Sequence, residues 1–460
     1  MGKLFGTNGI RGKFGEELTV DFVVKVALAI GTYFNGGSIL VGYDGRLSSP
    51  AIKEAVVSGL LASGCNVIEA GMLPTPTLQF GVKHLKCDGG VMITASHNPP
   101  EFNGIKVMGP DGVEISREEE LKIEDIYFSG QIKRAAWNEL GKIDYASNII
   151  DDYVKAVVSH VNVKHISAQG FKVVADPGNG VTALTAPKVL EMLNCEVILI
   201  NDVIDGRFPG RGPEPIPKVL GGISKIVREV NADLGVSYDG DGDRAIFTDE
   251  KGVIHWGDKS GAVIEKYVLE KLGGGLIVTP VSSSKMIEDV AIAHNGKVIW
   301  TKVGSVVVSH KLKEVNGILG IEENGGVFYP PHQPVRDGAM TTALILNVMA
   351  EKGEKLSELI DELPKYYNWK DKVPCPNNLK KPVIDEVLSL AMREEKMKID
   401  TIDGVKIWID ENTWVLIRAS GTEPIIRVYA EAKSEDEAIK IVENYKRKVR
   451  EIIGKLGGRG

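Results

Sequence analysis

Along most of its 460 residues, the chain alternates short apolar strands with amphipathic helices. Such alternation predicts α/β domains, because a helix that follows a strand returns the chain to the same end of the sheet. Three of the predicted strands, at 89–93, 234–238 and 318–321, run directly into polar loops. Loops at the carboxyl ends of strands carry the chemistry of open α/β sheets. The pattern therefore indicates three βα domains of similar topology, each with one candidate functional loop.

The pattern changes in the last quarter of the chain. Residues 363–382 contain four prolines and few aliphatic side chains, which is typical of a domain boundary. Beyond them, strands predicted at 405–409, 414–417 and 425–430 are followed by a single charged helix at 435–453, which indicates a small α+β domain. We therefore expect an α/β protein of three mixed-sheet βα domains and a C-terminal α+β domain. The expected domain bounds are 1–148, 149–252, 253–366 and 367–460.

The loop after residues 89–93 reads Thr-Ala-Ser-His-Asn-Pro-Pro and contains Ser96 and His97. Together with Lys106, these residues bring a hydroxyl, an imidazole and an ammonium group into a stretch of eleven residues. Two prolines prevent a helix from starting at once, so Ser96 is expected on irregular backbone, where it is a candidate nucleophile. The alternative is an ordinary turn, because serine, histidine, asparagine and proline are common turn residues.

The second of these loops places Asp239, Asp241 and Asp243 at alternate positions of a glycine-hinged turn. Each close pair of carboxylates repels by roughly 4 kcal/mol at an intermediate dielectric constant, so a bound cation is expected. Oxygen-only ligands favour Mg²⁺ or Ca²⁺ over Zn²⁺, and three carboxylates leave room for a phosphate oxygen. One alternative is an EF-hand-type calcium loop that ends at Glu250, although Arg244 stands where that loop has glycine. The other is a solvated acidic turn.

Two further loops offer guanidinium groups. The glycine-rich stretch 5–12 is predicted to be a loop that can lie close to a ligand, and Arg11 is its only strong cation apart from the flanking lysines. The turn 418–424, between two predicted C-terminal strands, combines arginine, hydroxyl and glycine residues, which favours an oxyanion site. Its alternative is a Ser-Gly-Thr turn with surface arginines. The candidate residues of this turn and the following strand are Arg418, Ser420, Gly421, Thr422 and Arg427.

The loop after the third predicted strand contains Glu322 and Asn324. Their side chains offer hydrogen-bond acceptors and donors suited to neighbouring hydroxyl groups, as on a sugar. An acidic surface turn would have the same composition, so this loop alone leaves both interpretations open.

The composition argues against two classes of partner. A net charge of −7 is unfavourable for a general nucleic-acid surface or an anionic-membrane surface. The longest apolar stretch near the start, 22–34, is interrupted by Lys25 and is too short to span a bilayer, and no signal peptide opens the chain. We expect a cytoplasmic protein that binds neither nucleic acid nor membranes.

A serine hydroxyl, a magnesium site, a hydroxyl-binding turn and a phosphate clamp are the parts that phosphoryl transfer needs. In this order, and over essentially the whole chain, the four loops resemble those of the α-D-phosphohexomutase superfamily, of the archaeal phosphoglucosamine mutase and phosphomannomutase-phosphoglucomutase type. The resemblance implies four domains around a central cleft. It also implies an enzyme that interconverts hexose 6-phosphate and hexose 1-phosphate through a phosphoserine and a 1,6-bisphosphate.

The same resemblance implies roles for single residues. Ser96 would carry the phosphoryl group, and one Mg²⁺ per chain would be bound by that phosphate and the three aspartates. Lys106 and His97 are candidates for proton transfer, while Arg11 and Arg244 would neutralise the phosphoserine. The matching residues are Ser96, His97, Lys106, Arg11 and Arg244 at the reacting phosphoryl group, Asp239, Asp241 and Asp243 at the metal, and Glu322, Asn324, Arg418, Ser420, Gly421, Thr422 and Arg427 at the sugar phosphate.

Two positions depart from the family pattern, with Asn324 where many relatives have serine and Gly326 where they have histidine. We expect glucosamine 6-phosphate as the substrate, a hexose 1,6-bisphosphate as activator, and a monomeric or homodimeric enzyme. The alternatives are phosphomannomutase/phosphoglucomutase activity, a metal-dependent phosphatase that uses the same serine, and a calcium- and sugar-binding module built on residues 239–250.

Overall fold

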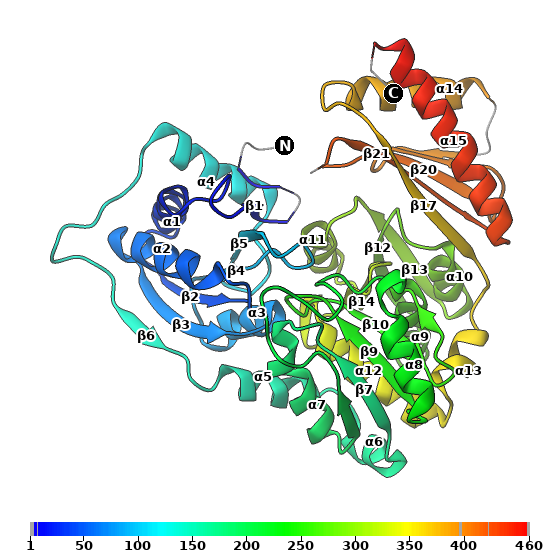
Figure 1. Ribbon diagram of the computed structural model, residues 1–460, viewed down its shortest axis with the longest axis horizontal. Helices are drawn as coiled ribbons and strands as arrows, with labels where there is room; N and C mark the ends of the chain where they lie inside the picture. The colour runs from blue at the N-terminus through cyan, green and yellow to red at the C-terminus, as the bar shows by residue number, and fades with distance from the viewer. Residues whose placement is uncertain (1–3, 7, 395–397, 422, 458–460) are drawn as a thin grey trace.

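The computed structural model describes residues 4–6, 8–394, 398–421 and 423–457 of the chain. These residues form four β-sheets of five or six strands, and each sheet is covered by its own helices (Figure 1). We name the four units domains I to IV in chain order. The predicted architecture of three βα domains followed by an α+β domain is confirmed.

Domain I contains a sheet in the order β1-β5-β4-β2-β3-β6. The parallel strands β2, β3 and β4 form its middle, and β5 runs antiparallel to β4. The helices α1 and α2 pack against one face, and α3 covers the other (Figure 1). The elements are β1 (Ile10–Lys13), α1 (Val20–Phe34), β2 (Ser38–Tyr43), α2 (Ser49–Ala62), β3 (Asn66–Met72), α3 (Thr75–His84), β4 (Gly89–Ile93), β5 (Phe102–Met108), α4 (Arg117–Ser129) and β6 (Ile143–Tyr145).

Domains II and III share one large hydrophobic cluster, which joins buried side chains of both and includes most of α12. The elements of domain II are α5 (Ile149–Val158), α6 (Val163–Gln169), β7 (Lys172–Asp176), the 3₁₀-helix Val181–Leu184, α7 (Ala186–Met192), β8 (Glu196–Leu199), the 3₁₀-helix Pro217–Val219, α8 (Gly221–Glu229), β9 (Leu234–Tyr238), β10 (Ala245–Asp249) and β11 (Ile254–His255). Those of domain III are α9 (Gly257–Leu272), β12 (Gly275–Pro280), α10 (Lys285–Ala293), β13 (Gly296–Thr301), α11 (Ser305–Val315), β14 (Leu319–Ile321), β15 (Val327–Tyr329), β16 (Gln333–Arg336), α12 (Gly338–Lys352) and α13 (Leu356–Asp361).

The first three sheets share one strand order: β5-β4-β2-β3, β10-β9-β7-β8 and β15-β14-β12-β13. In each sheet, one strand of the parallel set reverses through a loop into an antiparallel neighbour. The serine loop joins β4 to β5, the aspartate loop joins β9 to β10, and the loop with Glu322 joins β14 to β15. The three candidate loops therefore occupy equivalent places in three similar sheets.

Domain IV contains elements that the sequence analysis did not predict. Residues 363–382, which the composition indicated as a boundary, contain the strand β17 and the start of α14. β17 pairs along its whole length with β21 at the edge of the sheet, where a terminal proline is tolerated. Two helices, not one, cover this sheet. The elements are β17 (Tyr367–Pro374), α14 (Lys380–Arg393), β18 (Lys398–Asp400), β19 (Val405–Trp408), β20 (Trp414–Ala419), β21 (Ile425–Ala432) and α15 (Glu435–Lys455).

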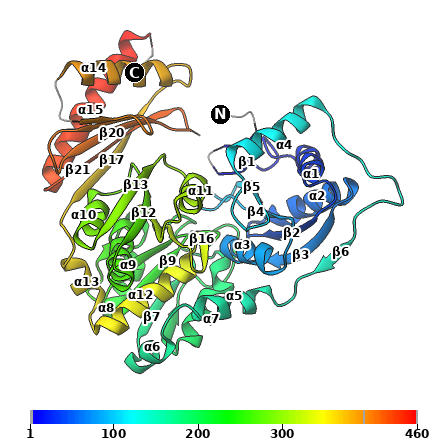
Figure 2. The ribbon, with the colours of Figure 1, turned by 180° about the vertical axis from the view of Figure 1, so that it is seen from behind.

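Domain IV has its own hydrophobic core and lies against domain III, on the side of the molecule that also faces domain I (Figures 1 and 2). The contact with domain III is built from a small cluster that includes Val281, Trp414 and Leu416. Among the residues that the structure describes, no helix is both long and apolar enough to cross a membrane.

Candidate active site

Ser96 lies where the loops of domains I and II meet. Its hydroxyl donates a hydrogen bond to Asp239 Oδ2 at 2.8 Å, and its Oγ is 3.3 Å from His97 Nδ1. The side chain is fully buried, and its backbone has a φ of +50°, a left-handed conformation that costs a non-glycine residue free energy. The amide of Ser96 donates to Thr94 Oγ1 at 2.8 Å. The surrounding structure thus holds this serine in a strained, defined position.

The support for this position is Arg46, which the sequence analysis missed. Its guanidinium is buried and donates to four main-chain carbonyl oxygens of the serine loop. These acceptors are Ser96 at 2.7 Å, Asn98 at 2.6 Å, Pro99 at 2.6 Å and Phe102 at 2.9 Å. Arg46 Nε in turn bonds Asp44 Oδ2 at 3.1 Å, so the charge is paired. The signal was present in the sequence, because Asp44-Gly45-Arg46 follows the end of β2 as the other polar loops follow their strands.

The three predicted aspartates come together beneath Ser96. Asp239, Asp241 and Asp243 are buried, and each offers an oxygen within 4.8 Å of the others. Burial, together with the charges of Asp243 and Asp241, raises the pKa of Asp239 well above its ordinary value. Asp241 Oδ1 and Asp243 Oδ1 have no hydrogen-bond partner. Buried, unsatisfied carboxylate oxygens that face one another are what a hard cation would stabilise.

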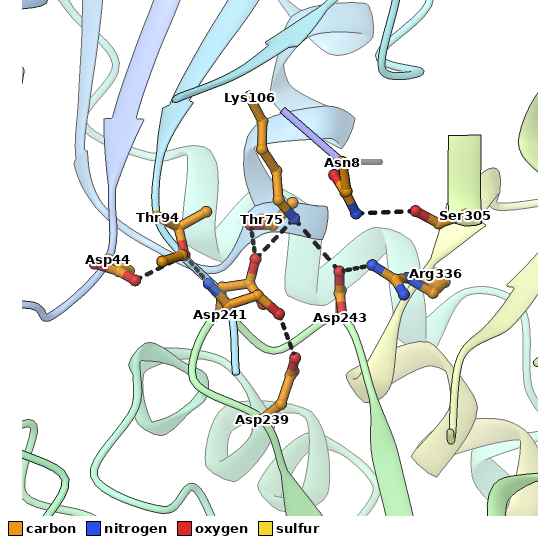
Figure 3. Close-up of polar contacts among 12 residues, drawn as sticks. Asn8, Asp44, Thr75, Thr94, Lys106, Asp239, Asp241, Asp243, Ser305 and Arg336 are labelled. Carbon is orange, nitrogen blue, oxygen red and sulfur yellow. Dashed lines mark hydrogen bonds and ion pairs between the residues drawn. The ribbon is translucent and has the colours of Figure 1, made fainter. Parts of the chain in front are cut away.

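Lys106 reaches into this group from β5 and points between two of the carboxylates (Figure 3). Its Nζ lies 3.0 Å from Asp241 Oδ2 and 3.5 Å from Asp243 Oδ2. Burial alone would lower the pKa of Lys106, but Asp241 and the neighbouring carboxylates outweigh it and raise that pKa. Thr75 donates to Asp241 Oδ2 at 2.6 Å from the start of α3. Burial opposes ionisation of Asp241, yet Lys106 and Thr75 hold its pKa below the ordinary range.

Arg336 connects the third loop to this centre and was also missed from the sequence. From the end of β16, its guanidinium bonds Asp243 (Figure 3). It also bonds Glu322 Oε2 at 3.0 Å. A Cβ at Gly326 would lie 2.4 Å from Arg336 Cδ. A residue with a side chain at position 326 therefore could not fit here unless Arg336 moved. Asn324 lies beside these residues, and its Oδ1 accepts the amide of Gly326 at 3.2 Å.

The two arginines predicted to face the phosphoserine border the same centre. Arg11 Nη1 donates to Asn98 Oδ1 at 2.6 Å and to the Ala95 carbonyl at 3.2 Å. Arg244 Nε lies 3.7 Å from Asp243 Oδ1 and has no hydrogen-bond partner. Burial and the charges of Arg244 and Arg11 lower the pKa of His97 well below its ordinary value, so its imidazole is neutral at neutral pH.

The fourth predicted loop lies apart from this centre. Arg418 pairs with Asp403, and Arg427 Nη2 bonds Glu423 at 2.8 Å, so both guanidinium groups are engaged within domain IV. Ser420 Oγ accepts the amide of Glu423 at 3.2 Å, Gly421 follows it, and Thr422 lies outside the described residues. The turn lies on the side of domain IV that faces domain I (Figure 2). The structure therefore brings three of the four loops into one cluster and leaves the fourth opposite it.

The EF-hand alternative does not fit this arrangement. The aspartate loop joins two antiparallel strands, β9 and β10, and not two helices. Glu250 lies beyond the far end of β10, where its Oε1 accepts a hydrogen bond from Ser357 at 2.6 Å. The carboxylate that would close a calcium loop is therefore occupied elsewhere.

Comparisons with known proteins match the whole chain. Family models described as phosphoglucomutase/phosphomannomutase alpha/beta/alpha domains I, II and III match residues 2–134, 151–252 and 256–367, and the model of the C-terminal domain matches residues 372–448. The chain is 46% identical to a phosphoglucomutase/phosphomannomutase of Thermococcus kodakarensis, over 96% of this chain and 97% of that protein. It is 45% identical to a phosphoglucosamine/phosphogalactosamine mutase of Sulfurisphaera tokodaii, over 97% and 99%. A crystal structure of a phosphoglucomutase/phosphomannomutase family protein from Burkholderia thailandensis superimposes with a TM-score of 0.88 at 27% identity, over 99% of this chain and 98% of that one.

Proposed function

Because this chain belongs to the phosphoglucomutase/phosphomannomutase family, we propose that it is a phosphohexomutase that works through a phosphorylated Ser96 and a hexose 1,6-bisphosphate. The observation that carries this proposal is the Ser96 hydroxyl, which bonds Asp239 within a buried aspartate cluster. Lys106 and two arginines border the same cluster, so negative charge on a phosphoryl group would be met by fixed cations.

We propose that Asp239, Asp241 and Asp243 hold one Mg²⁺ together with the phosphoryl group on Ser96. The residues fit such an ion, because all three donors are carboxylates and two of their buried oxygens have no hydrogen-bond partner. When bound, the ion withdraws charge from the phosphoryl oxygens.

The side chains of this protein divide the remaining work. As the substrate hydroxyl oxygen bonds to phosphorus, the bond from phosphorus to Ser96 Oγ breaks, and the hydroxyl proton must leave while Oγ gains charge. His97 Nδ1 and Lys106 Nζ are the groups placed to accept and to supply protons or charge at these oxygens. Arg11 and Arg244 would neutralise the phosphoserine. In the second half-reaction, Ser96 Oγ bonds to the phosphorus of the other phosphoryl group, the bond from that phosphorus to its sugar oxygen breaks, and the freed sugar oxygen takes up a proton.

We propose that Glu322 and Asn324 contact the sugar, and that the turn of Arg418, Ser420 and Gly421, with Arg427, binds the phosphate that is not transferred. The preferred substrate is proposed to be glucosamine 6-phosphate, with a hexose 1,6-bisphosphate as activator. Two similar proteins have names that include glucosamine: the Sulfurisphaera relative is a phosphoglucosamine/phosphogalactosamine mutase, and a Methanopyrus kandleri relative, 40% identical, is a probable phosphoglucosamine mutase.

The test is a comparative assay. Purified protein with Mg²⁺ and a trace of the matching 1,6-bisphosphate is given glucosamine, glucose and mannose 6-phosphates, and the 1-phosphates and inorganic phosphate are measured separately. We expect the glucosamine compound to be converted with the highest kcat/KM and without phosphate release. If none of the three is converted, the proposed activity is wrong; if phosphate appears in step with substrate loss, the protein is a phosphatase.

A further inference from the structure

One carboxylate oxygen joins the phosphate-binding arginine of domain IV to the main chain of domain III. Asp403 Oδ2 accepts hydrogen bonds from Arg418 Nε at 3.1 Å and from the amide of Val303 at 3.1 Å. Arg418 Nη2 lies 3.0 Å from the same oxygen. The charged group that orients Arg418 is therefore itself fixed to another domain.

The fold leaves little freedom at this position. Asp403 lies in the turn between β18 and β19, and the following residue, Gly404, has a φ of +85°. A Cβ on Gly404 would lie 2.3 Å from the carbonyl oxygen of Ile417, so only glycine lets the turn pack on β20 beside Arg418. The turn thus delivers the Asp403 carboxylate to the arginine by backbone geometry.

On the other side, Val303 belongs to the loop that leads into α11, and this loop contacts the serine centre. Ser305, the first residue of α11, is bonded by the Asn8 side chain at 3.0 Å, whichever way that amide is turned. The Asn8 carbonyl accepts from Arg11 Nε at 3.2 Å, and Arg11 bonds Asn98 in the serine loop. Contacts therefore run without a gap from Arg418 to the loop that carries Ser96.

The joint between domains III and IV does not depend on Asp403. Lys406 Nζ donates to the Val281 carbonyl at 2.9 Å and lies 3.9 Å from the centre of the Trp414 ring. Glu431 accepts the amide of Lys285 at 2.8 Å across the same joint. Since these buried contacts hold the two domains together, loss of the Asp403 carboxylate should leave the protein folded.

We propose that Asp403 is a positioning residue for phosphate binding: it fixes the Arg418 guanidinium and ties it to the loop before α11, so that the phosphate site is in register with Ser96 before substrate binds. This inference rests on the proposed function. Asp403 engages only the Nε and Nη2 side of the guanidinium, and among the described residues no hydrogen bond is formed by Arg418 Nη1. The Nη1 side of Arg418 is left for a phosphate oxygen. In this arrangement Asp403 orients the guanidinium, and the guanidinium binds the phosphate.

The test compares Asp403→Ala, Asp403→Asn and Arg418→Ala with Asp410→Ala, a control in the next turn of the same domain, where the Asp410 side chain accepts the amide of Asn412 and no other hydrogen bond from the described residues. Four quantities are measured: KM, kcat, the Kd of the hexose 1-phosphate by calorimetry, and the hydrogen-exchange rate of the peptide that contains Val303. We expect Asp403→Ala to raise KM and Kd about tenfold or more, as loss of an outer-shell partner does, with a smaller change in kcat. The Val303 amide should exchange at least about tenfold faster, and Asp403→Asn, which keeps an acceptor oxygen, should fall between.

The outcomes separate this inference from the proposed function. If Arg418→Ala weakens binding but Asp403→Ala and Asp403→Asn bind like the wild type, the positioning role is wrong and the phosphate site stands. If Arg418→Ala also binds like the wild type, the phosphate site itself is wrong. If exchange at Val303 is unchanged in Asp403→Ala, the link between the domains is wrong whatever the kinetics. Should Asp403→Ala fail to fold, the Asn variant decides the same questions.

Discussion

The serine centre and the turn proposed to bind phosphate differ in how many domains hold their side chains in place. Ser96 is fully buried, and Lys106 beside it is only 1% exposed, while side chains from domains I, II and III all contact the aspartate cluster. In the turn and the strand that follows it, the side chains of Glu423 and Arg427 are 44% and 33% exposed and that of Arg418 is 12% exposed, and all three belong to domain IV. The reacting groups are thus fixed from several sides, whereas the groups proposed for recognition sit on a unit attached to one neighbour (Figure 1).

This difference has a physical reason under the proposed mechanism. Phosphoryl transfer needs charges that are already in place, so its groups gain from burial and from many partners. A bisphosphate that must turn around between two transfers needs room, so the groups that hold its far end gain from a separate domain with its own core. We therefore expect substitutions at the serine centre to reduce turnover or stability, and substitutions in the turn to weaken substrate binding.

The largest effect is expected at the serine itself. Ser96→Ala removes the oxygen that would carry the phosphoryl group, so turnover of hexose 6-phosphate should fall at least about a thousandfold with little change in melting temperature. Ser129→Ala, an exposed serine at the end of α4, should leave turnover unchanged. An active Ser96→Ala variant would remove the basis of the mechanism. The measurement is initial rate with Mg²⁺ present.

The next effect concerns the support under the serine. Arg46→Met leaves Asp44 buried without its cation and removes the donor of four loop carbonyls, so the free energy of unfolding should fall by about 3 to 5 kcal/mol and activity should be lost. The matched control is Arg207→Met, because the Arg207 side chain is 73% exposed beside Asp205 and its loss should change the free energy of unfolding little. Urea denaturation measures both. Equal losses of unfolding free energy in Arg46→Met and Arg207→Met would contradict the expected difference between the buried centre and the surface.

A substitution in the turn proposed to bind phosphate should weaken substrate binding without lowering the stability of the protein. Arg418→Ala removes at least one charge-assisted hydrogen bond to the substrate phosphate, about 1.5 to 3 kcal/mol, so KM should rise roughly tenfold to over a hundredfold. Arg447→Ala, an exposed arginine on α15, should leave KM unchanged. Steady-state kinetics at saturating Mg²⁺ gives the values. Wild-type substrate affinity in Arg418→Ala would count against the whole turn.

The smallest effect concerns the joint between domains III and IV. Burial lowers the pKa of Lys406 from 10.5 to about 8, although Glu431 opposes this shift. Between pH 8 and 10.5 the unfolded chain therefore binds the proton more tightly than the folded one, and the stability of the wild type should rise with pH in this window. Relative to Lys406→Met, we expect a gain of about 1 to 3 kcal/mol, since the attraction of the ammonium to the tryptophan rings offsets part of the burial cost.

Thermal unfolding of the two proteins from pH 7.5 to 10.5, a range set by these pKa values, tests this expectation. Lys433→Met is the matched control, because Lys433 lies 3.6 Å from the Tyr366 ring but is exposed. It should show no such pH-dependent difference. A Lys406→Met curve parallel to the wild type would mean that Lys406 keeps its proton throughout.

The sequence alone determined the local features of this protein. Strand-to-loop transitions predicted the serine and aspartate loops, because turn residues and apolar strands act over a few neighbouring residues. The same local signals did not reveal β17 within residues 363–382, because this strand pairs with a strand more than fifty residues later. The resemblance of the four loops predicted the family, and the comparisons show that the chain belongs to it.

Only the tertiary structure decided which residues support the site. Arg46, Arg336 and Asp403 contact partners in other elements or other domains. Their roles therefore depend on long-range contacts that no local sequence pattern predicts. The tertiary structure also decided that three loops meet at Ser96 while the fourth stands opposite on its own domain. The reason is that the amino-acid sequence gives the chemistry of each side chain directly, whereas the distances between loops depend on how the sheets pack.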